Sequence, residues 1–378
     1  MTTEGTGVEP SSAMTPEQTM ELARGHQAAG ELVRAQALYR EVLRSAPGQP
    51  DALTMLASVG YQLGDDAGAA AQVDAAIAAY RRMLLSAPNN HGVRAALANL
   101  LLARQRRAEA EAVIAKAAVA FNPIRASQAE FDARRQSGRE RGLPGILINA
   151  LPKSASESIW NKLAQGLGIA QGHISIGLFP DCLAVPYRVR EFSRGGMAAK
   201  EHLPATTHNV AALAQAGVER VVVHVRDPRQ ALLSWAHFLE GDVRKRLLAP
   251  LWRKTTPPAD FFREPFATQL DWHIEHYLPI IVRFIDDWVE AGGSPAAGIS
   301  VKFLTFEAFK ADASGYFDEL LAFFGIDPAL YAADAEAEAI HLRKGAVDEW
   351  RGVFTAEQAA HIWQRIPGRL AEMFSWSP

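Results

Sequence analysis

The sequence predicts an α/β fold, a parallel β-sheet with helices on both faces, preceded by an all-α half. Three observations support this prediction. Short apolar runs alternate with amphipathic helical stretches in the second half, namely GILINA (145–150), VERVVVHV (218–225) and ISVKFLTF (299–306). Residues 16–120 are instead rich in alanine and leucine at helical spacing. All eight tryptophans lie at or beyond Trp160, so the two halves also differ in composition.

The helical half repeats itself. The segments LYREVLRSAPGQP (38–50) and AYRRMLLSAPNNH (79–91) align without a gap, and Pro47 matches Pro88; a weaker third copy ends at Pro123. Helix pairs closed by a proline, with small alanines where helices approach, resemble tetratricopeptide repeats. The two prolines are 41 residues apart. That family repeats every ~34 residues, so we expect about two extra helical turns in the middle repeat. Another antiparallel helical bundle is the alternative.

These patterns predict three segments. Residues 15–123 form the repeat-like domain, which offers a concave surface for a protein partner rather than chemistry. Residues 124–144 are polar and charged, and are interpreted as a linker or a solvated helix. Residues 145–378 form the α/β domain.

A small polar loop follows the first apolar run, in ILINALPKSASESIW (146–160). The run breaks at Pro152, the loop contains Lys153, and an amphipathic helix is expected from Glu157. A strand, a polar loop with one lysine and a helix N-terminus form a cradle for a tetrahedral anion. The nucleotide triphosphatase pattern GxxxxGK[ST] is absent, and the loop has no glycine.

Two further stretches place cations beside strand or loop signals. In VVVHVRDPRQALLSWAHF (221–238) a buried strand ends at Arg226, and Ser234 lies two turns into the following helix, so both can face one anion. The alternative is an arginine that caps a helix or pairs with an acid. In HLRKGAVDEWRGVFT (341–355) Arg343 and Lys344 precede Gly345, which suggests a tight anion-binding loop or only a solvated surface loop.

Together, these stretches resemble the sulfotransferase family that uses 3′-phosphoadenosine 5′-phosphosulfate (PAPS). PKSASES resembles the family's phosphosulfate loop P-K-[ST]-G-[ST]-[ST], Arg226 and Ser234 have the spacing of its 3′-phosphate motif, and RKGAVDEWRGVFT matches its C-terminal signature RKGxxGDWKxxFT. KEHLP (200–204) resembles the K-x-H-L-P segment that holds the catalytic histidine. The resemblance spans about residues 145–360, with four motifs in the family's order.

The resemblance implies that a phosphosulfate loop resembling a P-loop binds PAPS, and that 3′,5′-adenosine bisphosphate (PAP) is the product. It implies His202, Lys153 and Lys200 as catalytic residues. The implied cofactor-binding residues are Lys153, Ser154, Ala155, Ser156, Glu157, Ser158, Arg226, Ser234, Phe306, Arg343, Lys344 and Gly345.

The chain departs from the family pattern at three places. Ala155 replaces the loop glycine, so a left-handed backbone angle there would be strained. Trp160 stands two places beyond the family's adenine-stacking tryptophan, where this chain has Ser158. Phe306 stands where many cytosolic members have tyrosine, which keeps a ring but removes its hydroxyl.

The implied reaction is an in-line sulfuryl transfer, in which positioning and charge stabilisation supply most of the catalysis. His202 suits the base that takes the acceptor proton, Lys153 suits the leaving phosphate oxygen, and Lys200 is a helper. No metal is required. His224 is expected to be a core or sheet residue, while His208 and His237 are also close to the motifs. HIEH (273–276) lacks HExxH spacing and is interpreted as one face of an aromatic helix.

Composition limits the remaining possibilities. A net charge of −3 gives no argument for nucleic acid or an anionic membrane surface. The one cysteine, Cys182, excludes an internal disulfide and a multi-cysteine metal site. The N-terminus lacks the features of a secretory signal, and no apolar run is long enough to span a bilayer, so we expect a cytoplasmic protein.

Other functions stay open from the sequence. One is a repeat-based binding or scaffold protein with an inactive sulfotransferase-like domain, and another is a small-molecule or nucleoside kinase. Segments 172–196 and 248–265, expected to shape the acceptor pocket, mix aromatic and cationic residues. Such surfaces suit sugars, so we expect a glycan or glycoconjugate hydroxyl as acceptor, with a peptide tyrosine or a phenol as the alternative.

Overall fold

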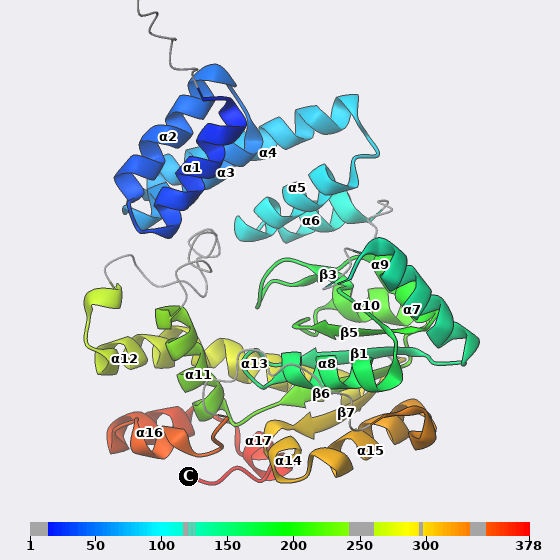
Figure 1. The fold of residues 1–378 in the computed structure, drawn as a ribbon. Coiled ribbons are helices and arrows are strands. Elements are labelled where there is room, and N and C mark those ends of the chain that lie inside the picture. The colour runs from blue at the N-terminus through cyan, green and yellow to red at the C-terminus, as the bar shows by residue number, and fades with distance from the viewer. Residues whose placement is uncertain are drawn as a thin grey trace, which may run out of the picture. The chain divides into compact units, whose positions relative to one another are not determined.

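The computed structural model describes residues 14–115, 121, 124, 126–241, 261–294, 298–332 and 345–378. The described residues divide into two compact units, one ending at Ala79 and the other beginning at Tyr80. Elements are labelled in Figure 1.

Among the described residues of the first unit, all regular structure is helical. Its helices are α1 (Pro16–Ala28), α2 (Leu32–Ser45), α3 (Pro50–Gln62) and α4 (Asp66–Ser86), which continues into the second unit. α4 has 21 residues and is longer than α2, which has 14. A Cβ at Gly60 would lie 3.0 Å from the Cβ of Ala69, which explains the small residues where α3 meets α4.

Three more helices precede the sheet. α5 (His91–Ala103) and α6 (Arg107–Ile114), expected within the repeats, belong to the same compact unit as the sheet. α7 (Gln128–Glu140) occupies the segment interpreted as a linker or a solvated helix. It is a helix with a capping box between Ser127 and Glu130, and its buried Phe131 shows that it is not wholly solvated.

The predicted parallel sheet is confirmed. Five strands lie in the order β2-β5-β1-β6-β7, and all paired neighbours are parallel. The strands are β1 (Gly145–Ala150), β2 (Ala170–Gly172), β5 (Met197–Glu201), β6 (Arg220–Val225) and β7 (Ser300–Thr305), while β3 (Ser175–Ile176) and β4 (Leu183–Ala184) form a separate antiparallel pair. β1 is central, because it pairs with β5 on one side and β6 on the other.

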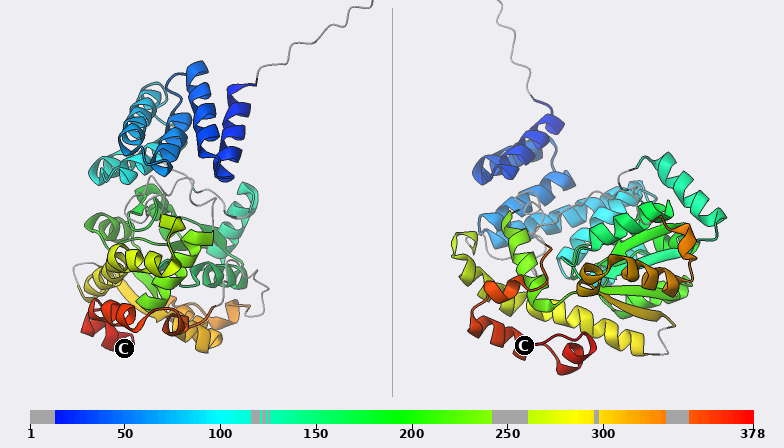
Figure 2. Two further views of the ribbon diagram at one scale, coloured as in Figure 1. Left: turned by 90° about the vertical axis from the view of Figure 1, so that its left-hand side faces the viewer. Right: turned by 60° about the horizontal axis from the view of Figure 1, so that its bottom comes forward.

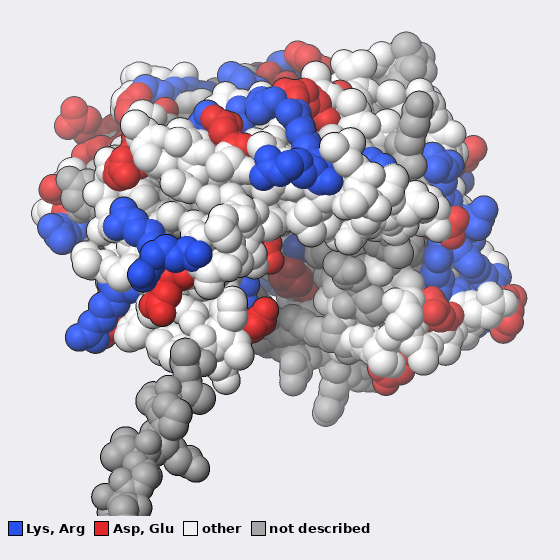
Figure 3. All heavy atoms as spheres, turned by 90° about the horizontal axis from the view of Figure 1, so that it is seen from above, with Lys and Arg blue, Asp and Glu red and all other residues white. Residues whose placement is uncertain are grey.

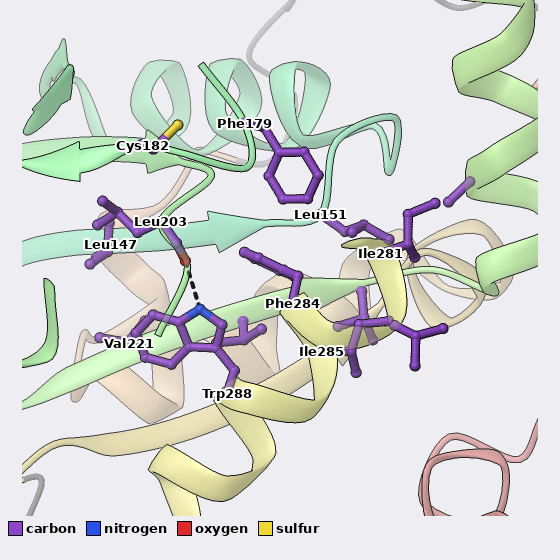
Figure 4. Close-up of a cluster of buried hydrophobic side chains, with 14 of the residues drawn as sticks. Leu147, Leu151, Phe179, Cys182, Leu203, Val221, Ile281, Phe284, Ile285 and Trp288 are labelled. Carbon is purple, nitrogen blue, oxygen red and sulfur yellow. Dashed lines mark hydrogen bonds between the residues drawn. The ribbon is translucent and has the colours of Figure 1, made fainter. Parts of the chain in front are cut away.

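Helices cover both faces of this sheet, as expected (Figures 1 and 2). Side chains alternate along β1, so Ile148 packs with α8 and α15, whereas Leu147 packs with α13. Figure 4 shows Leu147 in the hydrophobic cluster that also contains Trp288 of α13. The helices after β1 are α8 (Ser156–Leu167), α9 (Pro186–Ser193), α10 (Thr207–Gln215), α11 (Pro228–Gly241), α12 (Phe266–His276), α13 (Leu278–Gly293), α14 (Phe306–Ala311), α15 (Ala313–Phe324), α16 (Ala356–Gln364) and α17 (Gly368–Met373).

Charged side chains are interspersed on the face drawn in Figure 3, where lysines and arginines alternate with aspartates and glutamates. Such mixing agrees with the small net charge of −3. Within the described residues, no helix combines the length and apolar character needed to cross a membrane.

Candidate active site

Four adjacent strands each end at a residue named by the sequence motifs. β1 leads into the loop of Lys153, and β5 is followed at once by His202. β6 is followed at once by Arg226, and β7 by Phe306, the first residue of α14. Because the four strands are parallel neighbours, their carboxyl ends meet at one edge of the sheet. Ligands of open α/β sheets bind at this edge.

The loop after β1 turns tightly and takes a left-handed conformation twice. The φ angle is 67° at Lys153 and 65° at Ala155. Glycine adopts such an angle without strain, whereas alanine does not, so the strain considered at Ala155 is present. The buried Ser154 holds the turn, since its hydroxyl donates to the carbonyl of Leu151 at 2.6 Å. α8 then begins at Ser156 without a side-chain cap, which leaves its first N–H groups available to an anion.

A buried histidine and tyrosine support this loop. His224 of β6 is fully buried, and its Nε2 donates to the carbonyl of Ser154 at 2.6 Å. Its Nδ1 accepts from the hydroxyl of Tyr316 of α15 at 2.9 Å. Burial lowers the pKa of His224 to about 4, so the ring is neutral with its proton on Nε2. His224 lies in the sheet, as expected, but the sequence analysis did not predict that it supports the loop. The sequence feature that could have indicated this role is a histidine within an otherwise apolar strand.

Arg226 joins the loop after β1 to the C-terminal segment that contains Gly345. One of its terminal nitrogens donates to the carbonyl of Lys153 and the other to the carbonyl of Ala346, both at 2.7 Å. Its guanidinium carbon lies 3.9 Å from the centre of the Phe306 ring, a cation–π contact. Phe306 is 1% exposed, so its ring is covered by this arginine and its other neighbours. Gly345, beside Ala346, has a φ of 64°, which agrees with the tight backbone turn expected there.

A hydrogen bond to the main chain fixes which ring nitrogen of His202 carries the proton. Its Nδ1 lies 2.6 Å from the carbonyl oxygen of Ala150. A carbonyl only accepts hydrogen bonds, so Nδ1 carries the proton and Nε2 keeps its lone pair. Burial and the positive charge of Lys200 lower the pKa of His202 to about 3, which keeps the ring neutral at physiological pH. Phe179 lies edge-on to this ring at 6.4 Å between centroids.

Glu157, in the first turn of α8, and Lys200, in β5, form an ion pair. Lys200 Nζ lies 2.6 Å from Oε1 of Glu157, and the ammonium also faces the ring of Trp160 at 5.9 Å. Burial alone would raise the pKa of Glu157, but the adjacent Lys200 holds it below its ordinary value. Lys200 is therefore neutralised by Glu157 in this structure. Lys153 instead lies over the ring of Phe238, 4.2 Å from its centre.

A buried carboxylate that the motifs did not identify follows Lys200. Glu201 is 3% exposed and accepts hydrogen bonds from the main chain of Ile174 and the hydroxyl of Ser175. Burial would raise its pKa, but nearby His173 and these two donors lower it. Glu201 thus anchors the segment that carries β3 beside the end of β5.

The remaining residues of the motifs lie in α8 and α11 or outside the described residues. Ser234 lies half-buried in α11, and its hydroxyl makes no hydrogen bond within the described residues. Ser156 and Ser158 are buried in the first turn of α8. Trp160 is a core residue whose indole donates to the carbonyl of Ala198 at 3.0 Å. The structure describes neither Arg343 nor Lys344, nor residues 248–260 of the expected acceptor segment.

The other histidines have structural surroundings. His208 Nε2 lies 3.1 Å from the carbonyl of Ala184, and His237 stacks on Phe266. The HIEH stretch closes α12, where His273 is buried among aromatic rings. Among the described side chains, no group of three or more His, Cys, Asp or Glu is placed to hold a metal ion.

Comparison of the chain with protein-family models, curated proteins and solved structures found no match.

Proposed function

We propose that this chain is a sulfotransferase that transfers the sulfuryl group of PAPS to an acceptor hydroxyl. The observation that carries the proposal is the edge formed by four parallel strands. There, Lys153, Arg226 and Phe306 follow three strands, and His202 follows the fourth with Nε2 as an acceptor. These are the residue types and the chain order of the motifs that resemble the family.

The residues fit the anionic groups of PAPS. The 5′-phosphosulfate would bind the uncapped N-terminus of α8 and the Lys153 loop, where left-handed residues turn backbone N–H groups inward. The 3′-phosphate would bind near Arg226, which already joins that loop to the Gly345 segment. Phe306 is the ring assigned to adenine, and it must become accessible beside Arg226 to stack with a base.

The proposed step divides its work between two residues. As the acceptor oxygen bonds to sulfur, its proton passes to Nε2 of His202. The bond from sulfur to the 5′-phosphate oxygen breaks, and Lys153 neutralises the charge that develops on that oxygen. Sulfated acceptor and PAP leave, and the proton on His202 returns to solvent. No metal takes part in this proposed step.

Ion pairing argues for this reaction over phosphoryl transfer from ATP. A kinase needs carboxylates to hold magnesium beside its phosphate loop, and Glu157 and Asp227 are the nearest candidates in the sequence. Glu157 pairs with Lys200, and Asp227 lies 2.7 Å from the guanidinium of Arg229. Each carboxylate already has a cation as its partner.

The acceptor proposed is the hydroxyl of a glycan or glycoconjugate, with the helical half as the surface that recruits a large acceptor or a protein partner. Phe179 lies in the segment 172–196, edge-on to His202, and is only 6% exposed. The proposal of a sugar acceptor therefore rests on the mixed aromatic and cationic composition of that segment.

Two measurements test the proposed function. PAP should raise the melting temperature of the full chain, whereas ATP with magnesium should not. With PAPS and a panel of sugar, phenol and tyrosyl-peptide acceptors, His202→Ala should lower kcat by at least about a hundredfold while PAP affinity stays unchanged. His361→Ala is the matched control, because this histidine lies in α16 beside Glu275 and outside the site. Stabilisation by ATP–magnesium alone, or full turnover by His202→Ala, would reject the proposal.

A further inference from the structure

The chain that carries His202 leaves the sheet immediately after β5. The pairing of β5 with β1 ends at Glu201, which lies opposite Asn149. Leu203 is fully buried two residues later, and its N–H and carbonyl need partners away from water. Pro204 follows and has no N–H with which to continue a ladder.

The side chain of Asn149 supplies these partners. Its Oδ1 accepts from the N–H of Leu203 at 2.7 Å, and its Nδ2 donates to the carbonyl of Leu203 at 3.0 Å. A carboxamide donates and accepts at once, as a backbone peptide does, so Asn149 extends the ladder from β1 beyond the last paired residue. Asn149 is itself 0% exposed.

Trp288 of α13 completes the arrangement. Its indole Nε1 donates to the same carbonyl of Leu203 at 2.7 Å (Figure 4). The Leu203 carbonyl therefore accepts two hydrogen bonds, one from the sheet side and one from a helix on its face. We call Asn149, Leu203 and Trp288 the Leu203 clamp.

Two residues of the clamp are chain neighbours of the groups that position His202. Ala150, the residue after Asn149, accepts the hydrogen bond from the ring. Leu203, the residue after His202, is held by Asn149 and Trp288. The end of β1 thus fixes both the imidazole and the main chain beside it.

We propose that Asn149 and Trp288 are positioning residues that hold the His202 ring against the Ala150 carbonyl, with the proton on Nδ1 and Nε2 directed to the acceptor. The catalytic consequence rests on the proposed sulfotransferase function, whereas the control of the ring's tautomer and position does not. Asn149 and Trp288 touch neither the acceptor nor PAPS in this role, and they act through His202.

The test uses the full chain labelled with ¹⁵N-histidine, with the His202 signal assigned by its loss in His202→Gln. In the wild type we expect the Nδ1–H tautomer, and an Nδ1 proton that exchanges slowly with water. Asn149→Leu removes both clamp bonds of the carboxamide, and Trp288→Phe removes only the indole donor. Both should give mixed tautomers and at least tenfold faster Nδ1 proton exchange. Asn161→Leu is the matched control, since this 3%-exposed amide bonds Gln171 and is not part of the clamp.

A milder variant keeps the test decisive if Asn149→Leu does not fold. Asn149→Ala removes the carboxamide without putting a branched side chain in its space and without adding a charge, so it should show the same change. The titratable groups near His202 are Lys200, Glu201, Glu157 and His173, and none is altered in these variants. If turnover is measurable, kcat should fall by on the order of a hundredfold with PAP affinity unchanged.

The outcomes separate this inference from the proposed function. Unchanged tautomer and exchange in Trp288→Phe and in either folded Asn149 variant would overturn the clamp's role, whatever the activity. An equal effect in Asn161→Leu would also overturn it, because it would reflect general loss of packing. If the variants show mixed tautomers but the wild type shows no PAPS-dependent turnover, the clamp's role is supported and only the proposed sulfotransferase function is rejected.

Discussion

Replacing Arg226 tests the link between the loop after β1 and the C-terminal segment. Its side chain holds the carbonyls of Lys153 and Ala346 and covers the ring of Phe306. Hydrogen bonds from a charged group contribute about 1.5–3 kcal/mol each. Arg226→Ala therefore removes about 3–6 kcal/mol of interactions, part of which water recovers. A loss of only about 1.4 kcal/mol in ligand binding is a tenfold weaker affinity, so we expect PAP to bind at least about tenfold more weakly.

Two further variants identify the cause of this loss. Arg226→Lys keeps the positive charge but presents one ammonium instead of a planar fork, so it cannot bond both carbonyls in the same geometry. It should recover less than half of the lost binding free energy. Arg220→Ala is the matched control, because Arg220 begins the same strand and donates to the carbonyl of Phe324 at the other end of β6. We expect it to bind PAP like the wild type.

Calorimetry with PAP provides the affinities, and thermal unfolding checks that each variant is folded. Wild-type affinity in Arg226→Ala would remove this residue from the proposed cofactor site. Full recovery by Arg226→Lys would show that charge alone matters and that the bridge between the two segments does not. A loss in Arg220→Ala as large as that in Arg226→Ala would indicate a general effect on β6.

Other predictions concern stability. Ala155→Gly should raise the free energy of unfolding by up to ~1 kcal/mol in urea titrations, because glycine relieves the left-handed angle at 65°. Ala211→Gly, inside α10, should instead lower it by about 1 kcal/mol, and a loss in both would contradict the strain argument. Lowering the pH from 7 to 5 should lower the free energy of unfolding by roughly 3–4 kcal/mol through His224 and His273 alone, since burial lowers their pKa values to about 4 and about 3 and the unfolded chain takes up protons near 6.5. His202, whose pKa is lowered to about 3, adds to this loss. This contribution is complete above pH 6.5 and is lost on acidification, so equal stability at both pH values, or an unchanged slope in His224→Gln, would contradict it.

The sequence by itself determined the class of fold and which strands are followed by charged residues. Apolar runs that alternate with amphipathic stretches can be satisfied by a parallel sheet covered on both faces, and β1, β6 and β7 lie where three such runs predicted them. Charged residues at strand ends could be identified because they interrupt buried runs, as Arg226 does after β6.

Tertiary structure decided how those charged residues are held. Arg226 meets a carbonyl 120 residues later, Asn149 bonds the main chain 54 residues later, and His224 supports a loop 70 residues earlier. Every residue has a carbonyl, so a backbone acceptor leaves no signal in the sequence that names its partner. The pairing of Lys200 with Glu157 likewise depends on which strand lies beside β1. Strand order is set by packing of whole elements, and only that packing selects these partners from the many that the same residues could bond.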